Sequence, residues 1–327
     1  DGFNFQGDKN GSKWNPNVRE IPRALKTGKL DLRPNSQAVQ ITHDRNGKVD
    51  GVLYIDTKTK ALHRQEAKVV CVAGNSIETP RLFLMSASSM FPNGLANSSD
   101  QVGRNYMRHL TGSVYARFDK PVNFYRGETM AGFLADEVKN NPKRGFVGGY
   151  YLETLALGPS FMGAFLEPGG WGKKFADMMD GYRNLAGMWI VGEDMPQANN
   201  RITLGSAKDA FGLPAPNVHF DDHPNDTAMR NHAYKVGEKI YKSVGAKQTW
   251  RTTPYPHTHN LGTMRMSAKK KDGVTNKWGR CHDIKNLFVS DGSVMTTGAA
   301  CNPTLTIVAL AIRQGEYLAD QLKKGKI

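Results

Sequence analysis

Two histidines, His257 and His259, stand one residue apart in the segment YPHTHNLGT. Imidazole has a pKa near working pH, so a histidine can take a proton from a reacting hydroxyl group. The same spacing could place two metal ligands on one strand face, but no further acidic residues or histidines at ligand spacing complete a metal site. Judged by its residue type alone, a histidine in such an aromatic-rich segment is more often a packing residue.

A second stretch that could bind a ligand is CNPTLTIVALAIR, residues 301–313, which predicts a helix start. Asn302 suits the N-cap and Pro303 suits the first helical position, where its missing N–H is not needed. The helix follows a loop of small residues, 296–300, so a ligand could approach free backbone N–H groups and a partial positive charge. One apolar face is predicted from the helical spacing of Leu305, Val308, Ala309 and Ile312.

The composition is that of an ordinary globular chain, with 327 residues, 39% hydrophobic and 23% charged. No apolar run approaches the ~20 residues that span a bilayer. The formal net charge is +14, but apart from Lys269–Lys271 and the C-terminal KKGK the basic residues are scattered. Scattered charge argues against a nucleic-acid site and is compatible with an acidic protein partner or with solubility alone. The three cysteines form no CxxC motif and cannot all pair with one another.

The first part of the chain predicts strands and one strand–glycine–helix unit. Strands are expected at 29–34 and 38–44, followed by a hairpin turn at Asn46-Gly47 and a returning strand. The apolar run 67–74 predicts a strand buried on both faces of a parallel sheet, and it ends at Gly74. A helix with Ser76 as its N-cap is expected directly afterwards, as in an open α/β sheet.

The middle of the chain, 112–266, has a different character, with aromatic residues, glycines and short extended stretches that predict a mainly antiparallel sheet. One helix is expected there, at 225–245. After residue 280 the α/β pattern returns, with a strand that ends at Asp291-Gly292. We therefore predict an α/β plus α+β fold, in which 1–111 and 267–327 form one sheet domain and 112–266 is inserted.

Several stretches, in the same order, resemble the glucose–methanol–choline (GMC) flavin oxidoreductases. They are VVCVAGNSIETPRLFLMS, DQVGRNYMRH, EDMPQANNRITL, HNLGTMRM and VSDGSVMTTGAACNPTLTIVALAIR. Within the family, the sequences NSIETPRLFLMS and NSSDQVGRN are most similar to flavoprotein subunits of bacterial sugar and polyol dehydrogenases, of the gluconate and fructose dehydrogenase type. The resemblance implies that the sheet domain is part of a Rossmann-like FAD-binding domain and that the inserted part is a substrate domain.

The chain departs from the family pattern in one respect, because it contains no GxGxxG turn for the FAD pyrophosphate. The interpretation we favour is that this sequence is the C-terminal portion of a longer protein. The N-terminal FAD segment would then be a separate chain, be removed by cleavage, or lie upstream of Asp1.

The resemblance also assigns roles to residues. His259 occupies the place of the catalytic base, and Asn302 the place of a second residue that holds the substrate hydroxyl. Thr304 and Leu305 would offer N–H groups to the flavin, while Pro303 shapes the turn. The remaining cofactor positions that the resemblance implies are Ala38, Gly74, Asp291 and Gly292.

The function implied is FAD-dependent oxidation of an alcohol group of a sugar, sugar acid or polyol. Electrons would pass to a cytochrome or quinone, in a bacterial periplasmic heteromer with a cytochrome-containing subunit. One alternative is an oxidase of the same fold that releases hydrogen peroxide. Another is a chain without catalysis that serves only as a structural or binding partner.

Overall fold

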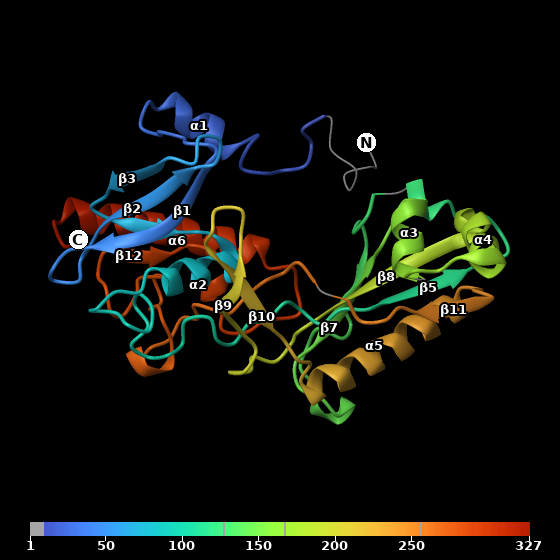
Figure 1. Ribbon diagram of the computed structural model, residues 1–327. Coiled ribbons are helices and arrows are strands. Elements are labelled where there is room, and N and C mark those ends of the chain that lie inside the picture. The colour runs from blue at the N-terminus through green and yellow to red at the C-terminus, as the bar shows by residue number, and fades with distance from the viewer. Residues whose placement is uncertain (1–9, 127, 167, 256) are drawn as a thin grey trace. The chain divides into compact units, whose positions relative to one another are not determined.

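The computed structural model describes residues 10–126, 128–166, 168–255 and 257–327 (Figure 1). The chain divides into two compact units, and each is described by itself. Unit 1 consists of Asp1–Arg33, Leu110–Glu193 and Pro224–Pro256, and unit 2 consists of Pro34–His109, Asp194–His223 and His257–Ile327.

Unit 2 opens with a three-stranded antiparallel sheet. Its strands, in the order β1-β2-β3, are β1 (Ser36–His43), β2 (Val49–Asp56) and β3 (Leu62–Glu66). The predicted turn is confirmed, with Gly47 at φ 77° between β1 and β2. The strand predicted at 29–34 is wrong: these residues follow the short helix α1 (Glu20–Lys26), are exposed and have no neighbouring strand to complete a ladder.

A parallel strand pair carries the helices that matter for the site. β4 (Val70–Val72) pairs with β12 (Leu287–Val289). Val70 and Val72 are buried but Cys71 is exposed, so the expected burial on both faces is wrong for this chain. The strand is covered on one face only, by the core around Phe83 and Leu287.

Helix α2 (Asn75–Met85) follows β4 at Gly74. Ser76 does not cap it, contrary to the prediction, because its hydroxyl is buried and donates to the carbonyl oxygen of Asn260 at 2.8 Å. Instead the side chain of Asn75 accepts from the N–H of Ile77 at 2.8 Å. The start of α2 is thus bonded to the segment that carries the predicted base.

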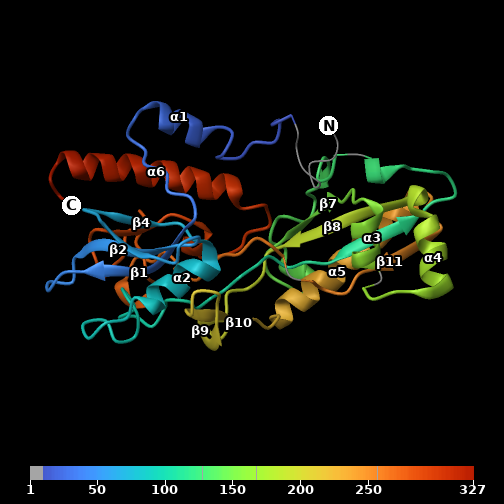
Figure 2. The ribbon, with the colours of Figure 1, turned by 45° about the horizontal axis from the view of Figure 1, so that its top comes forward.

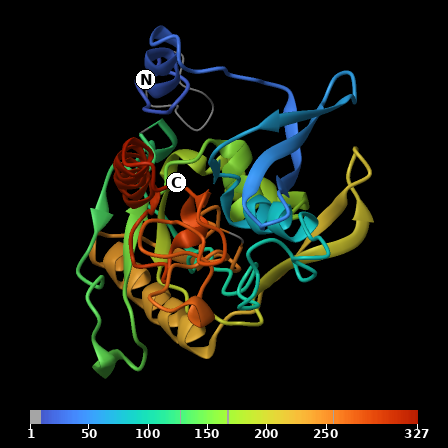
Figure 3. The same ribbon diagram turned by 90° about the vertical axis from the view of Figure 1, so that its left-hand side faces the viewer.

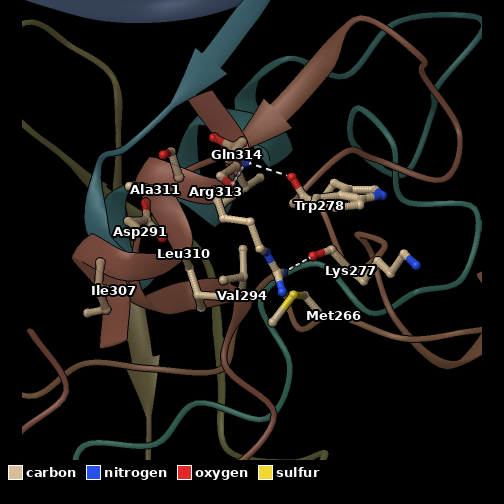
Figure 4. Close-up of a pocket in the computed structure, with 13 residues that line it drawn as sticks. Met266, Lys277, Trp278, Asp291, Val294, Ile307, Leu310, Ala311, Arg313 and Gln314 are labelled. Atoms are coloured by element: carbon tan, nitrogen blue, oxygen red, sulfur yellow. Dashed lines mark hydrogen bonds between the residues drawn. The ribbon is translucent and has the colours of Figure 1, made fainter. Parts of the chain in front are cut away.

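Helix α6 (Thr304–Lys323), labelled in Figures 1 and 2, packs against the end of β12. Its only buried residue among those described is Gln314, whose Nε2 donates to the carbonyls of Trp278 (3.0 Å) and Val289 (2.8 Å). Arg313 donates to the carbonyl of Lys277 (Figure 4). The packing face therefore includes Ile307, Leu310 and Gln314, which line a small cavity of about 10 Å³.

Two predictions about α6 are wrong. The helix begins at Thr304 with Pro303 as its N-cap, and no side chain caps it, so Asn302 is not the N-cap. The predicted apolar face is the outer face, since Leu305 and Ile312 are 85% and 60% exposed. Packing is instead decided by the polar anchor Gln314, which apolar periodicity does not detect.

A two-stranded hairpin, β9 (Arg201–Lys208) and β10 (Pro214–His219), also belongs to unit 2 (Figure 3). It contacts α2 through Arg81, which bonds to Asp209 at 2.6 Å and to the carbonyl of Pro214 at 2.8 Å. The predicted division at 112–266 therefore differs from the structure, because this hairpin and the segment after Pro256 pack with unit 2.

Unit 1 is built on five antiparallel strands: β5 (Ser113–Arg117), β6 (Phe133–Leu134), β7 (Tyr150–Thr154), β8 (Leu185–Gly192) and β11 (Gln248–Arg251). They form one sheet in the order β11-β5-β8-β7-β6, as predicted for the middle of the chain. Helix α5 (Pro224–Ser243) covers one face through a core that includes Val114, Ile190 and Met229. Unit 1 also contains α1, α3 (Pro159–Leu166) and α4 (Gly172–Asp180). Of the helices that the structure describes, none combines the length and apolar character needed to cross a membrane.

Candidate active site

Three histidines meet in unit 2: the predicted base His259, its neighbour His257, and His109 from the end of the segment VGRNYMRH. The Nδ1 atoms of His109 and His259 lie 2.9 Å apart. The rings of His257 and His259 have centroids 3.8 Å apart. The other ring nitrogen of His109, Nε2, lies 2.7 Å from the carbonyl oxygen of Gly298.

Burial keeps all three imidazoles neutral. His109 and His257 are 1% and 4% exposed, and His259 is half-buried. Loss of hydration lowers the pKa of His109, and together with the neighbouring histidines it lowers the pKa of His257 to about 2 and of His259 to about 3. A neutral imidazole has a lone pair, so the site can accept a proton at neutral pH.

His257 fixes the backbone that carries His259. Its Nδ1 atom accepts from the backbone N–H of Thr258 at 2.9 Å and of His259 at 3.2 Å. A short turn around the His257 ring is thereby held in one conformation. Among the residues that the structure describes, no three His, Cys, Asp or Glu side chains form a group that could hold a metal ion.

Asn260, directly after His259, is fixed from two other segments. Its Oδ1 accepts from the hydroxyl of Tyr106 at 2.5 Å, and its carbonyl accepts from Ser76 at 2.8 Å. Burial raises the pKa of Tyr106 to about 12, so this hydroxyl remains a donor at neutral pH. Residues 257–260, which we call the base segment, are therefore hydrogen-bonded to α2 and to the VGRNYMRH segment.

The carboxylate of Asp291 joins β12 to the start of α2. One oxygen, Oδ2, accepts from the N–H of Asn75 at 3.0 Å and from the hydroxyl of Thr79 at 2.6 Å. The other, Oδ1, accepts from the N–H of Ser293 at 2.8 Å and also from its hydroxyl. These four bonds fix the loop geometry at the carboxyl ends of both parallel strands. Gly74 is part of the same junction, because its backbone N–H donates to the hydroxyl of Thr79 at 2.9 Å.

Gly292 lies where the two strands' loops approach the base segment. A Cβ atom there would be 2.9 Å from the carbonyl oxygen of Asn260 and equally close to Leu261, so only glycine fits without a shift. It begins the short 3₁₀ helix η5 (Gly292–Val294). Ala38, by contrast, lies half-buried on β1, where it packs against the hydrophobic core of unit 2.

The N-terminus of α6 carries the remaining predicted residues. Pro303 is buried, whereas Asn302, Thr304 and Leu305 are exposed. The first-turn N–H groups of an uncapped helix have no acceptor within the helix and remain available to a ligand.

The structure brings the predicted residues together in two groups. His259 and the loop that leads to Asn302 meet through His109, which contacts His259 on one side and Gly298 on the other. Asp291 and Gly74 meet at the junction of β12 and α2. Ala38 is bonded to neither group in the described residues.

His109 is the residue that the sequence prediction missed. The one signal in the sequence was its place at the end of DQVGRNYMRH, a stretch on which the family resemblance rests; the next residue, Leu110, begins the second segment of unit 1. Its backbone has φ 61°, a conformation that is uncommon for a residue other than glycine. Nothing in the local pattern tells that its ring reaches His259, because that contact spans 150 positions of the chain.

Comparison with known proteins places this geometry in a family. The GMC oxidoreductase profiles match residues 1–111 and 196–311, which together exceed half of the chain. The 2-methyl-1,2-propanediol dehydrogenase of Mycolicibacterium austroafricanum is 38% identical over 97% of this chain and 59% of its own length. The fructose dehydrogenase large subunit of Gluconobacter japonicus is 30% identical over 92% of this chain and 56% of its own length.

A solved structure agrees at the level of the fold. Formate oxidase from Aspergillus oryzae superposes with a TM-score of 0.66 at 17% identity, over 94% of this chain and 63% of its own. The chain thus spans less than two thirds of the length of each of these proteins. The family expected from the sequence is confirmed: this chain belongs to the GMC oxidoreductases.

Proposed function

We propose that the chain carries the proton-accepting half of the active site of an FAD-dependent dehydrogenase. The substrate would be an alcohol group of a sugar, sugar acid or polyol, and the base would be His259. The observation that carries this proposal is the position of the His259 ring, which bonds to His109 and through it to Gly298 in the loop that leads into the N-terminus of α6.

FAD is the cofactor of the family, and the residues of unit 2 are compatible with it. The uncapped start of α6 offers the N–H groups of Thr304 and Leu305, with a positive partial charge suited to an anionic ring or phosphate. The carboxylate of Asp291, which is predicted to contact the cofactor, also accepts four hydrogen bonds within the protein. In this proposal it shapes the binding loop, and Gly74 and Gly292 allow close approach of backbone.

The chemistry divides between cofactor and protein. Bound FAD supplies the acceptor for the hydride that leaves the alcohol carbon. The protein must take the hydroxyl proton, and the neutral ring of His259 has a lone pair that can accept it. Asn302, exposed at the head of α6, is proposed to hold the same hydroxyl through its carboxamide.

The substrate class is supported by the two relatives named above, which act on a diol and on fructose according to their names. Both are called dehydrogenases, which favours an electron acceptor other than oxygen. We therefore propose a cytochrome or quinone as the acceptor, and a periplasmic location with a partner subunit. An oxidase would differ by producing hydrogen peroxide in step with substrate consumption.

The test is the rate of flavin reduction in His259→Asn, measured anaerobically by stopped-flow absorbance on the full-length, flavin-loaded protein. We expect a loss of about 10²–10⁴-fold, the usual contribution of general base catalysis. His43→Asn is the matched control, since His43 is also a half-buried histidine of unit 2 but bonds to Asp44 and Ser88. An unchanged reduction rate in folded, flavin-loaded His259→Asn would end the assignment of the base.

A further inference from the structure

The hydrogen bonds around His109 determine which nitrogen of His259 carries hydrogen. A carbonyl oxygen can only accept, so the bond of His109 Nε2 to Gly298 O at 2.7 Å requires hydrogen on Nε2. Burial lowers the pKa of His109, so its ring is neutral and its Nδ1 atom has only a lone pair. Nδ1 of His109 must therefore accept.

The partner in that bond is Nδ1 of His259, at 2.9 Å. Because His109 accepts, His259 donates, and its single hydrogen in the neutral state lies on Nδ1. The lone pair of His259 is then on Nε2. No hydrogen bond from the described residues reaches Nε2, and the residue is only half-buried, so this nitrogen remains open to a substrate.

The surroundings leave His109 little freedom. It is 1% exposed, and its ring stands at 90° to that of His259. A Cβ atom on Gly298 would be 2.9 Å from Cδ2 of His109 and 3.0 Å from Oδ1 of Asp194, so a side chain at 298 would displace the ring. The backbone of His109 is left-handed, with φ 61°, a strained conformation for a residue other than glycine.

Other polar groups near the ring do not compete for the same atoms. Asp194 Oδ2 accepts from the backbone N–H of Arg108 at 2.7 Å. The Nδ1 atom of His257 is taken by two backbone N–H groups. The two hydrogen bonds therefore run in one direction. His259 donates from Nδ1 to His109, and His109 donates from Nε2 to the carbonyl oxygen of Gly298.

We propose that His109 is a positioning residue, which holds His259 in the tautomer with hydrogen on Nδ1 and so presents Nε2 to the substrate hydroxyl. The proposal rests on the proposed role of His259 as base. When the hydroxyl proton arrives at Nε2, His259 becomes an imidazolium, and the lone pair of His109 stabilises its Nδ1–H. No proton needs to leave His109 in this step.

The first test is structural and needs no turnover. Nitrogen-15 NMR of the full-length, flavin-loaded protein with labelled histidine, assigned by comparison with His259→Asn and His109→Asn, reports which ring nitrogen carries hydrogen. We expect hydrogen on Nδ1 of His259 and on Nε2 of His109 near pH 7. Hydrogen on Nε2 of His259 would overturn the proposal whether or not His259 is the base.

The second test compares two substitutions that both suit a left-handed backbone. His109→Asn retains an oxygen near the position of Nδ1 that can accept from His259, whereas His109→Gly removes the acceptor. We expect flavin reduction to fall about 10- to 10³-fold in His109→Gly, within the range of general base catalysis, and to be largely retained in His109→Asn. Added imidazole should partly restore His109→Gly by filling the space that the ring leaves.

A purely structural role predicts a different pattern. Both variants would then lose thermal stability, with reduction rates in the folded fraction equal to that of the unmodified protein, and that result would contradict the proposal. A wrong base assignment would give a different pair of results. His259→Asn would then reduce flavin at the normal rate, while the NMR spectrum of the unmodified protein would still show hydrogen on Nδ1 of His259.

Discussion

At the scale of single residues, the carboxylate of Asp291 organises the junction on which the predicted cofactor loop is built. It accepts four hydrogen bonds, from residues that lie on β12's loop and on α2. A carboxylate in this position acts as an acceptor only, and that is what four converging donors require. The acid is therefore needed for the shape of the loop, in addition to any contact with a cofactor.

Asp291→Asn tests this role. The amide would place an NH₂ group against donors, and we expect a loss of about 1–3 kcal/mol in the free energy of unfolding. Denaturant unfolding followed by tryptophan fluorescence measures it. Asp31→Asn is the control, because Asp31 is an exposed partner of Arg33 and such pairs contribute about 0–1 kcal/mol. Equal effects of the two substitutions would contradict the structural role of Asp291.

The buried histidines make stability depend on pH. The unfolded chain takes up protons on these rings below pH about 6.5, whereas the folded pKa values of His257 and His259 are lowered to about 2 and about 3. Stability is therefore full above pH 6.5 and falls as the pH drops towards 3, by up to about 1.4 kcal/mol per pH unit for each ring.

Unfolding free energies measured from pH 7.5 to 5 should show this slope. His257→Asn should lower the slope by up to about 1.4 kcal/mol per pH unit, the contribution of one proton. The window lies above the range in which carboxylates titrate, so histidines dominate it. A slope that His257→Asn does not alter would mean that this ring is protonated in the folded protein.

At the scale of elements, α6 shows what sequence patterns can and cannot predict. The existence of the helix, of the β1–β2 hairpin and of the α2 unit followed from apolar periodicity and turn residues. The orientation of α6 did not, because Gln314 anchors the inner face while Leu305 and Ile312 point outward. His259 was identified through resemblance, and His109 was missed because its partner is distant in the sequence.

Gln314→Leu tests the anchor. The substitution leaves the carbonyls of Trp278 and Val289 without this donor. We therefore expect the free energy of unfolding to fall by about 1–3 kcal/mol. Gln321→Leu on the same helix is the matched control, since the side-chain amide of Gln321 donates to the carboxylate of the adjacent Asp320. Its expected effect is within about 0.5 kcal/mol, as for ordinary surface positions. Similar losses in both variants would show that Gln314 is not a specific anchor.

At the scale of the whole molecule, the formal net charge of +14 would favour association with an acidic partner protein. The chain has 44 basic and 30 acidic side chains, and long-range attraction increases the rate of association with a partner of opposite charge. Such attraction weakens with salt, because the screening length falls from about 10 Å at 0.1 M to about 3 Å at 1 M.

We therefore expect electron transfer from the full-length protein to an acidic cytochrome to slow by at least about tenfold between 0.02 M and 0.5 M salt. Stopped-flow reduction of the cytochrome measures the second-order rate constant. A neutral, small dye acceptor serves as the control and should respond little to salt. Equal responses of both acceptors would exclude electrostatic steering, and rapid reoxidation by oxygen alone would favour an oxidase.

The pairing of β4 with β12 has a consequence for the time course of biosynthesis. These strands are neighbours in space, yet more than 200 positions separate Val72 from Leu287, and Asn286 also bonds to Val49 and to Lys68. At roughly 5–20 residues per second, translation needs about 10–40 s to supply the second strand after the first. During that interval the nascent chain carries β4 with an unpaired hydrogen-bonding edge and an incomplete core, so chaperone occupancy should be highest before β12 emerges from the ribosome.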